Sequence, residues 1–448
     1  MRQRADPYQA RARELCAAAG IDPDSRIERP GQRSMPAWCG YREAARAEHV
    51  AHEAEIAAAE IAIKPQAPKF QNSPLKIFGQ HDENTVAQMH NCMAVGNVVA
   101  GVICADGHLG YAQPVGGVIA YEKQISISGV GFDIGCGNMA VRLDIPYSTI
   151  EGQARTIIKD VSGVISFGVG RTNEERADHA LFDDADAWRE SDMEAYRQKA
   201  LAQLGTVGSG NHYIDLMCDE HGFVWIGVHF GSRGLGYTSA TRYLKAAGGK
   251  DGMNVPPAVV DEDSELGRRY IAAMELAGRY AYAGREWVIE RVRKLIGGAV
   301  TDTVHNHHNY AWRETHAGED LWVVRKGATP AFPGQRGFVG GSMGDDAVIV
   351  EGVESKESKE ALYSTIHGAG RLFGRKEAKR RFARDEMDNW LRERGVILVG
   401  ADLDESPMAY RRLPEVLLQH SRSVKVLHTL RPFAVAMAGA GEFDLFRD

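Results

Sequence analysis

The sequence predicts an α+β protein, with one large mixed α/β domain preceded by a partly helical N-terminal extension. Three observations lead to this prediction. From residue 76 onward, short runs rich in β-branched and aromatic residues alternate with longer helical patterns. The turns between these runs are rich in glycine, and the first part of the chain differs from the rest in being rich in Ala, Arg and Glu.

The extension is expected to cover residues 1–70. Residues 44–63 favour a helix by propensity alone. Pro65, Pro68 and Pro74 then interrupt any helix, because proline lacks the backbone N–H and clashes with the preceding turn. The main domain is therefore expected to span residues 71–448.

Within the main domain, strands are expected at residues 115–121 and 223–230, and helices at residues 264–295 and 356–361. No internal repeat, coiled-coil heptad or low-complexity tract is apparent in the sequence. One long domain is the simplest interpretation.

Composition predicts an ordinary cytoplasmic enzyme with no membrane partner. The chain has 448 residues, of which 44% are hydrophobic and 25% charged, and no apolar run approaches the length of a membrane span or signal core. The net charge of −7 argues against a polyanion held by overall charge, so any such contact must be local. The six cysteines lack C-x-x-C spacing and are expected to be mostly buried, reduced thiols.

Glycines cluster in six places, at residues 107–117, 129–137, 205–210, 231–236, 334–344 and 368–370. A tight turn explains any single cluster as readily as a functional loop does. Six clusters beside polar side chains favour a backbone that approaches a ligand closely.

Potential metal ligands lie in these turns. An isolated histidine is more often a surface or core residue than a ligand, and an isolated cysteine is usually a small buried hydrophobe. Asp133 and Cys136, however, are spaced so that both side chains can converge on one metal. The ligand types fit Mn, Fe, Co, Ni or Zn without choosing among them. The candidate ligands are Asp106, His108, Asp133, Cys136, His212, His229, His305, His307 and His308.

Seven motifs in a fixed order resemble the RtcB RNA ligase family. They read DGHLGY from Asp106, VGFDIGCG from Val130, GSGNH from Gly208, HFGSRGLG from His229, RKGAT from Arg325, GSMG from Gly341 and HGAGR from His367. The resemblance spans roughly residues 75–440 and leaves out the N-terminal extension. It implies a catalytic domain that binds two Mn²⁺ ions, with cysteine shared between them. The implied ligands are Asp133, Cys136, His212, His229 and His308, the last chosen because His-Asn-Tyr fits the family pattern.

The resemblance also implies a reaction. His367 would attack GTP, carry the GMP and pass it to an RNA 3'-phosphate, derived where necessary from a 2',3'-cyclic phosphate. The RNA-(3')pp(5')G end would then be attacked by a 5'-hydroxyl, in tRNA splicing or RNA repair. His108 would position the RNA end or move a proton, with a structural role beside Asp106 as the alternative. An archease-type activator is a further partner that the resemblance implies.

The resemblance also implies which residues of this chain contact GTP and RNA. The implied nucleotide contacts are Asn211, Asp215, Ser342, Gly368, Ala369, Gly370, Arg371 and Tyr410. Arg233, Arg371, Arg325 and Lys326 are candidates for phosphate or RNA contact. For Arg325 and Lys326, solvated surface charge is the alternative interpretation.

The sequence departs from the family pattern around the nucleotide. Met437 replaces a lysine, and Asp215 replaces a longer glutamate. Asp345 and Asp346 stand where small or hydroxyl residues are usual, and these two carboxylates are expected to repel a phosphate unless they bind a metal. These changes indicate a divergent paralogue. They leave open two alternatives to ligation, namely a metal-dependent RNA-end phosphodiesterase or phosphatase and a non-catalytic RNA-end binder.

Overall fold

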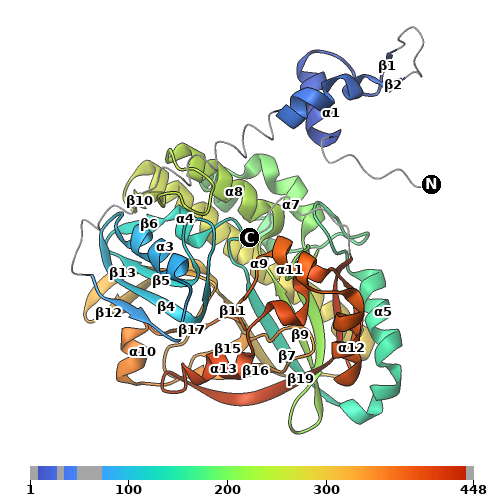
Figure 1. The fold of residues 1–448 in the computed structure, drawn as a ribbon, viewed down its shortest axis with the longest axis vertical. Coiled ribbons are helices and arrows are strands. Elements are labelled where there is room, and N and C mark those ends of the chain that lie inside the picture. Colours follow the sequence, from blue (N-terminus) through green and yellow to red (C-terminus); the bar gives the residue numbers. More distant parts are fainter. Residues whose placement is uncertain (1–8, 28–34, 48–72, 440–448) are drawn as a thin grey trace. The chain divides into compact units, whose positions relative to one another are not determined.

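The structure is a computed structural model that describes residues 9–27, 35–47 and 73–439 (Figure 1). The chain forms two compact units, Met1–Gln66 and Ala67–Asp448. The larger unit mixes helices and sheets throughout, which confirms the predicted α+β class.

Within its described residues, the N-terminal unit contains helix α1, at Gln9–Ala18, and a short antiparallel pair, β1 Arg26–Ile27 with β2 Met35–Pro36. A 3₁₀ turn, η1 at Ala37–Tyr41, leads into helical residues 42–47. The helix predicted at residues 44–63 therefore begins inside the described part of the chain, and its remainder lies outside it.

The main unit is built on two sheets. The larger has eight strands, and β18 joins it by running parallel to β19. The strands of its main path are, in spatial order, β11 Val300–His307, β7 Gly137–Pro146, β9 Phe223–Phe230, β8 Tyr213–Cys218, β19 Val424–Gly439, β16 Ala347–Gly352 and β15 Arg336–Val339, and β18 is Ile397–Ala401.

The second sheet has five strands, and two short strand pairs accompany the sheets. The five-stranded order is β12 Asn309–His316, β13 Glu319–Lys326, β5 Val115–Tyr121, β4 Val98–His108 and β3 Leu75–Ile77. The short pairs are β6 Gln124–Ser126 with β10 Val259–Asp261, and β14 Ala328–Pro330 with β17 Ser364–Ile366. Strands β5 and β9 confirm the two predicted strands.

Helices cover the sheets (Figure 1). The α-helices of the main unit are α3 Glu83–Met93, α4 Ile127–Val130, α5 Ala154–Val164, α6 Ala185–Glu190, α7 Arg197–Gln203, α8 Arg233–Ala246, α9 Glu265–Ile296, α10 Lys356–Glu360, α11 Arg375–Arg381, α12 Arg384–Glu393 and α13 Leu413–Leu418. The 3₁₀ turns are η2 Tyr147–Thr149, η3 Glu151–Gln153, η4 Ala180–Phe182, η5 Glu194–Tyr196, η6 Leu403–Glu405 and η7 Pro407–Ala409. Helices α9 and α10 confirm the two predicted helices.

Helix α9 is the central support, and its 32 residues link two cores. Ser264 caps its start by accepting a hydrogen bond from the Gly267 N–H, and Gly297 ends it with a φ of 92°, which glycine adopts without strain. Its first half packs in one apolar cluster with Tyr270 and Met274, and its last turns pack with the eight-stranded sheet. Burying both apolar stretches fixes the strands over this helix.

The strand order brings several candidate ligands to neighbouring strand ends on one side of the larger sheet. β7 begins just after Cys136, β8 begins just after His212, and β9 ends one residue past His229. The register pairs His229 with Tyr213 on one side and with Asn138 on the other. Antiparallel pairing thus places chain segments that are far apart in sequence next to one another.

Arg325 corrects one expectation, because it is neither an RNA-contacting residue nor a surface charge. Its side chain is 0% exposed and bonds both oxygens of Glu314, at 2.6 and 3.0 Å. It also donates to Ser364 Oγ and the Leu362 carbonyl. The guanidinium is therefore a buried structural group between strands β12, β13 and β17.

No helix in the described ranges is both long and apolar enough to cross a membrane.

The buried ion pair gives a stability prediction. Replacing Glu314 by Ala leaves Arg325 charged and unpaired in the interior, which is expected to lower the free energy of unfolding by about 3–5 kcal/mol. Urea unfolding followed by circular dichroism measures this loss. The double variant Glu314→Leu/Arg325→Met removes both charges and is expected to lose less. An equal or greater loss in the double variant would contradict the assignment of the cost to an unpaired charge.

Candidate functional site

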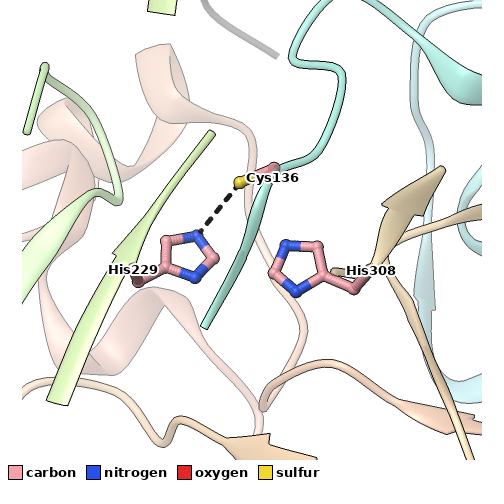
Figure 2. A group of neighbouring side chains, drawn as sticks. All are labelled: Cys136, His229 and His308. Atoms are coloured by element: carbon pink, nitrogen blue, oxygen red, sulfur yellow. Dashed lines mark hydrogen bonds between the residues drawn. The ribbon is translucent and has the colours of Figure 1, made fainter. Parts of the chain in front are cut away.

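Three buried side chains at the strand ends of the larger sheet form the first group of possible metal ligands. Cys136, His229 and His308 each offer one ligand atom, and these atoms all lie within 4.8 Å of one another. Figure 2 shows the Cys136 sulfur directed toward the ring of His229, at 3.7 Å from Nε2. The rings of His229 and His308 stack at a centroid distance of 5.0 Å.

A second group shares the same cysteine. Asp133, Cys136 and His212 also place one ligand atom each within 4.8 Å of one another. His212 Nε2 lies 3.7 Å from Cys136 Sγ and 3.1 Å from Asp133 Oδ2. Each set could hold one metal ion, and the Cys136 sulfur could then be a ligand to both ions.

The far sides of the imidazoles are held by other groups. His212 Nδ1 lies 3.0 Å from the Val207 carbonyl, and His229 Nδ1 lies 2.5 Å from Asn138 Oδ1. These contacts orient each ring so that Nε2 faces the sulfur. His308 Nδ1 is buried and has no hydrogen-bond partner among the described residues, which is a suitable state for a nitrogen that binds a cation.

Charge states in this cluster suit metal binding. Burial lowers the pKa of His229 and of His308 well below the usual value, so both rings are neutral. Burial alone would raise the pKa of Asp133, but its hydrogen bond with His212 and the nearby Arg233 outweigh burial and lower the pKa to about 2. Neutral imidazoles and an ionised carboxylate are the forms that bind metals.

Arg285 braces the segments that carry these ligands. It is fully buried and donates hydrogen bonds to the carbonyls of Gly135, at 3.0 Å, and of Phe230, at 2.6 Å. Two further bonds run to His305 and His307, at 2.9 and 3.0 Å. These two histidines therefore belong to the support beneath the cluster and not to either ligand group.

His367 lies against a buried carboxylate. Its Nδ1 is 2.6 Å from Asp106 Oδ2, and the same oxygen accepts the backbone N–H groups of His367 and Gly368, at 2.9 and 3.2 Å. Burial alone would raise the pKa of Asp106, but the neighbouring His367 outweighs it and the pKa is lowered. A carboxylate at Nδ1 favours the proton on that nitrogen and leaves a lone pair on Nε2.

His108 is the third group of this arrangement. Its Nδ1 lies 3.0 Å from the Asp106 carbonyl oxygen, and burial lowers its pKa to about 3. The His108 and His367 rings are 6.5 Å apart, and those of His308 and His367 are 5.0 Å apart. The histidine pair and the ligand groups thus form one continuous cluster.

One cavity of about 900 Å³ contains both the ligand cluster and His367. Its walls also include all the residues that the resemblance assigned to a nucleotide, namely Asn211, Asp215, Ser342, Gly368, Ala369, Gly370, Arg371 and Tyr410. Lys326 lies on the wall too, buried, with its Nζ donating to the Tyr111 carbonyl at 2.8 Å. Lys326 is therefore not a solvated surface charge.

Arg233 contacts a candidate ligand from outside the cavity. Its Nη1 lies 3.3 Å from His212 Nδ1, so it supports a candidate ligand and is not among the residues that line the cavity.

Asp215 occupies the floor of the cavity. Cross-strand pairing sets Tyr213 against Met437 and Asp215 against Val435, so these four side chains share one face of the sheet. Asp215 Oδ1 and the Tyr213 hydroxyl are buried and have no hydrogen-bond partner within the described ranges. Burial raises the pKa of Asp215 to about 8. This end of the cavity holds polar atoms that a ligand can satisfy.

Asp345 does not present the free charge that was expected. Its Oδ2 accepts a hydrogen bond from Ser342 Oγ at 2.6 Å and pairs with Arg412 at 2.7 Å. The Arg412 charge offsets the carboxylate, and Asp345 and Asp346 are not among the cavity-lining residues. The expected repulsion of a phosphate by Asp345 is therefore wrong.

Sequence reasoning named Arg371 and Tyr410 but missed their neighbours Arg375, Asp404 and Glu405. Arg371 donates to the Tyr410 hydroxyl at 2.7 Å and to the Asp404 carbonyl at 2.6 Å, and Arg375 pairs with Asp404 and Glu405. The four-residue spacing of Arg371 and Arg375 was the available signal. Asp106 was considered only as a ligand, and its contact with His367 has no local signal because 261 positions separate the two residues.

Comparison with known proteins agrees with the motifs. A family model described as "tRNA-splicing ligase RtcB" matches residues 88–438. A "tRNA-splicing ligase RtcB" of Thermococcus kodakarensis is 32% identical over 84% of this chain and 97% of its own. An "RNA-splicing ligase RtcB" of Escherichia coli K12 is 30% identical over 73% of this chain and 88% of its own. One from Mycobacterium tuberculosis is 29% identical over 72% and 92%.

The match covers most of the main unit, including the ligand cluster and His367, and defines the chain as a member of a ligase family. The chain belongs to the RtcB family.

The raised pKa of Asp215 predicts a pH-dependent stability. The folded pKa of about 8 exceeds the ordinary 3.8, so this carboxyl contributes most below pH 4 and loses its contribution as pH rises toward 8. Relative to the unaltered protein, Asp215→Asn is therefore expected to gain stability across that range, by on the order of a few kcal/mol. Urea unfolding at a series of pH values measures the difference.

The exposed Asp160 on α5 provides the control. Asp160→Asn makes the same chemical change at an exposed position. A pH profile for Asp215→Asn that does not differ from that of Asp160→Asn would contradict the perturbed carboxyl.

Proposed function

We propose that this protein is a GTP- and Mn²⁺-dependent RNA ligase that joins RNA 3'-phosphate or 2',3'-cyclic phosphate ends to 5'-hydroxyl ends. One observation carries the proposal. His367, held by Asp106 at 2.6 Å, faces the same cavity as two ligand groups that share Cys136. The proposed nucleophile and the groups able to hold cations thus line one cavity.

In the first step, His367 Nε2 attacks the α-phosphorus of GTP. A P–N bond forms, the bond to the bridging oxygen breaks, and pyrophosphate leaves. Asp106 holds the proton on Nδ1 and stabilises the positive charge that develops on the ring. The two ligand groups would hold Mn²⁺ ions, which when bound would neutralise charge on the phosphate oxygens.

The second and third steps transfer GMP and join the strands. An oxygen of the RNA 3'-phosphate attacks the phosphorus on His367, and the P–N bond breaks. The 5'-hydroxyl of the other strand then attacks the 3'-phosphorus of the RNA-(3')pp(5')G end and expels GMP. His108, beside Asp106 and neutral by burial, is suited to orient the RNA end, since a pKa of about 3 makes its ring a weak base toward an incoming hydroxyl.

The nucleotide is proposed to lie between the Gly368–Arg371 turn and the strand floor. Asp215 Oδ1 and the Tyr213 hydroxyl offer buried polar contacts to a base, while Met437 contributes an apolar surface. Arg371 and Tyr410 hold one side of the cavity through their mutual bond. Selection of GTP in the absence of a lysine at position 437 therefore depends on Asp215.

Covalent labelling tests the first step. Incubation with Mn²⁺ and GTP labelled at the α-phosphate is expected to leave label on the protein, and His367→Ala is expected to abolish it. Asp106→Asn is expected to slow labelling by about 10²-fold or more, because the ring loses its orienting carboxylate.

The control is His90→Ala, a change at an exposed histidine of α3, which is expected to label normally. Opening of a 2',3'-cyclic phosphate without label or joined product would contradict ligation and favour a phosphodiesterase on this scaffold, in which Met437 prevents guanylylation.

Metal stoichiometry tests the shared sulfur. After incubation with Mn²⁺ and removal of the excess, elemental analysis is expected to find two ions per chain. His308→Ala and His212→Ala each disrupt one ligand group and are expected to retain about one ion. Cys136→Ser alters both groups and is expected to lose both ions. Retention of two ions by Cys136→Ser would contradict the bridging role.

The RNA joined in the cell is proposed to be a spliced or damaged RNA, tRNA among them, with an archease-type activator as a partner of the reaction. Joining rates on tRNA halves and on other cleaved RNAs, with and without such an activator, compare these substrates.

A further inference from the structure

Helix α11, Arg375–Arg381, carries five cations and one acidic residue beside the cavity. Three of the cations are neutralised within the fold. Arg375 pairs with Asp404 and Glu405, Lys379 pairs with Asp402 and Asp404, and Arg381 pairs with Glu377. The pairs of Arg375 and Lys379 dock α11 against η6, and the pair of Arg381 with Glu377 lies within α11 itself.

The other two cations, Lys376 and Arg380, are exposed and line the cavity. Neither has an acidic partner within ion-pairing distance among the residues that the structure describes. Four positions apart on a helix, their side chains lie on one face, with Cβ atoms roughly 6 Å apart. They form a pair of free positive charges at the cavity wall.

Helix stability alone does not explain both charges. Arg380 lies in the last turn, where a cation interacts favourably with the helix dipole. Lys376 lies in the first turn, where a cation is disfavoured. Nearby, Leu372 lines the same cavity with 53% of its surface exposed, which is an apolar surface suited to a nucleobase. Adjacent cations that follow the backbone are one feature of single-strand binding surfaces, and Leu372 adds an apolar contact beside them.

The overall charge makes such a local surface necessary. With a net charge of −7, the protein repels a polyanion at long range, so binding depends on cations concentrated where the strand runs. The acidic residues of α11 and η6 that border the cavity, Glu377 and Glu405, are already paired with arginines. An incoming phosphate therefore meets Lys376 and Arg380 without a competing free carboxylate from these two elements.

We propose that Lys376 and Arg380 bind the sugar-phosphate backbone of single-stranded RNA next to the reacting end, with Leu372 contacting a base. The inference rests on the proposed function, because it takes the partner to be RNA. It adds a docking surface, the exposed face of α11, that leads the strand into the cavity. Contacts of this kind position the strand without reading its sequence.

Fluorescence anisotropy tests this docking surface, using the full-length protein without GTP or metal. The probe is a labelled single-stranded RNA of about 20 nucleotides with a 3'-phosphate, and Lys376→Glu/Arg380→Glu is expected to raise its Kd at least about tenfold at low salt. The slope of log Kd against log salt is expected to fall by about two, one for each phosphate that the variant no longer neutralises. The neutral variant Lys376→Gln/Arg380→Gln is expected to show a smaller change in the same direction.

A matched pair of cations provides the control. Arg155 and Lys159 are exposed, four positions apart on α5, and do not line the cavity. Arg155→Glu/Lys159→Glu makes the same change in net charge. If it weakens RNA binding as much as the α11 variant does, overall charge is the cause and the proposal is overturned. Thermal melting of both variants verifies that they are folded.

RNA length provides a second criterion. A dinucleotide with a 3'-phosphate is too short to reach beyond the reacting end. Its dissociation constant, obtained by competition with the probe, is therefore expected to be the same for the unaltered protein and the α11 variant. A fall in dinucleotide affinity as large as that for the long RNA would overturn the proposal. Because these measurements need no GTP, a protein that binds RNA through α11 yet forms no labelled His367 would refute the proposed function and leave this surface standing.

Discussion

The Cys136 sulfur lies 3.7 Å from both His212 Nε2 and His229 Nε2, and it belongs to both groups of candidate ligands. A single atom with two sets of neighbours constrains the fold strongly, because three strands have to end within a few ångströms of it. The order β7-β9-β8 satisfies this requirement by antiparallel pairing. Helix α9 then supports the strands from beneath, where Arg285 ties the Gly135 and Phe230 carbonyls together.

The other side chains of the site are arranged so that their charges are either removed by burial or balanced by a partner. Buried imidazoles stay neutral and can bind a cation, and Asp106 is buried beneath His367 with two backbone N–H groups on one oxygen. Most arginines near the cavity form hydrogen bonds or ion pairs within the protein. Arg371, for example, donates to the Tyr410 hydroxyl and to the Asp404 carbonyl. On α11, by contrast, Lys376 and Arg380 are exposed and have no acidic partner among the described residues, which gives this acidic protein a local positive surface beside the cavity.

The half of the cavity that carries the candidate metal ligands and the half proposed to bind the nucleotide differ in how far they follow the family pattern. The five candidate ligands are those that the motifs indicate, and the structure gathers them. The cavity floor formed by β8 and β19 departs from the family pattern, with Met437 beside Tyr213 and with a buried Asp215 whose pKa is raised. The relatives are only about 30% identical, so altered nucleotide recognition within a retained fold is consistent with their distance.

Features encoded within a few residues were predictable from the sequence alone. The turn that carries Asp133 and Cys136, the strands β5 and β9 and the helix α9 depend on local spacing and periodicity, which a linear pattern records. Arg325 was misread because its motif does not reveal which face of β13 is buried against Glu314. The tertiary structure alone decided the division of ligands into two groups around one sulfur. It also decided the pairing of Asp106 with His367, because distant segments meet only when the sheets are assembled.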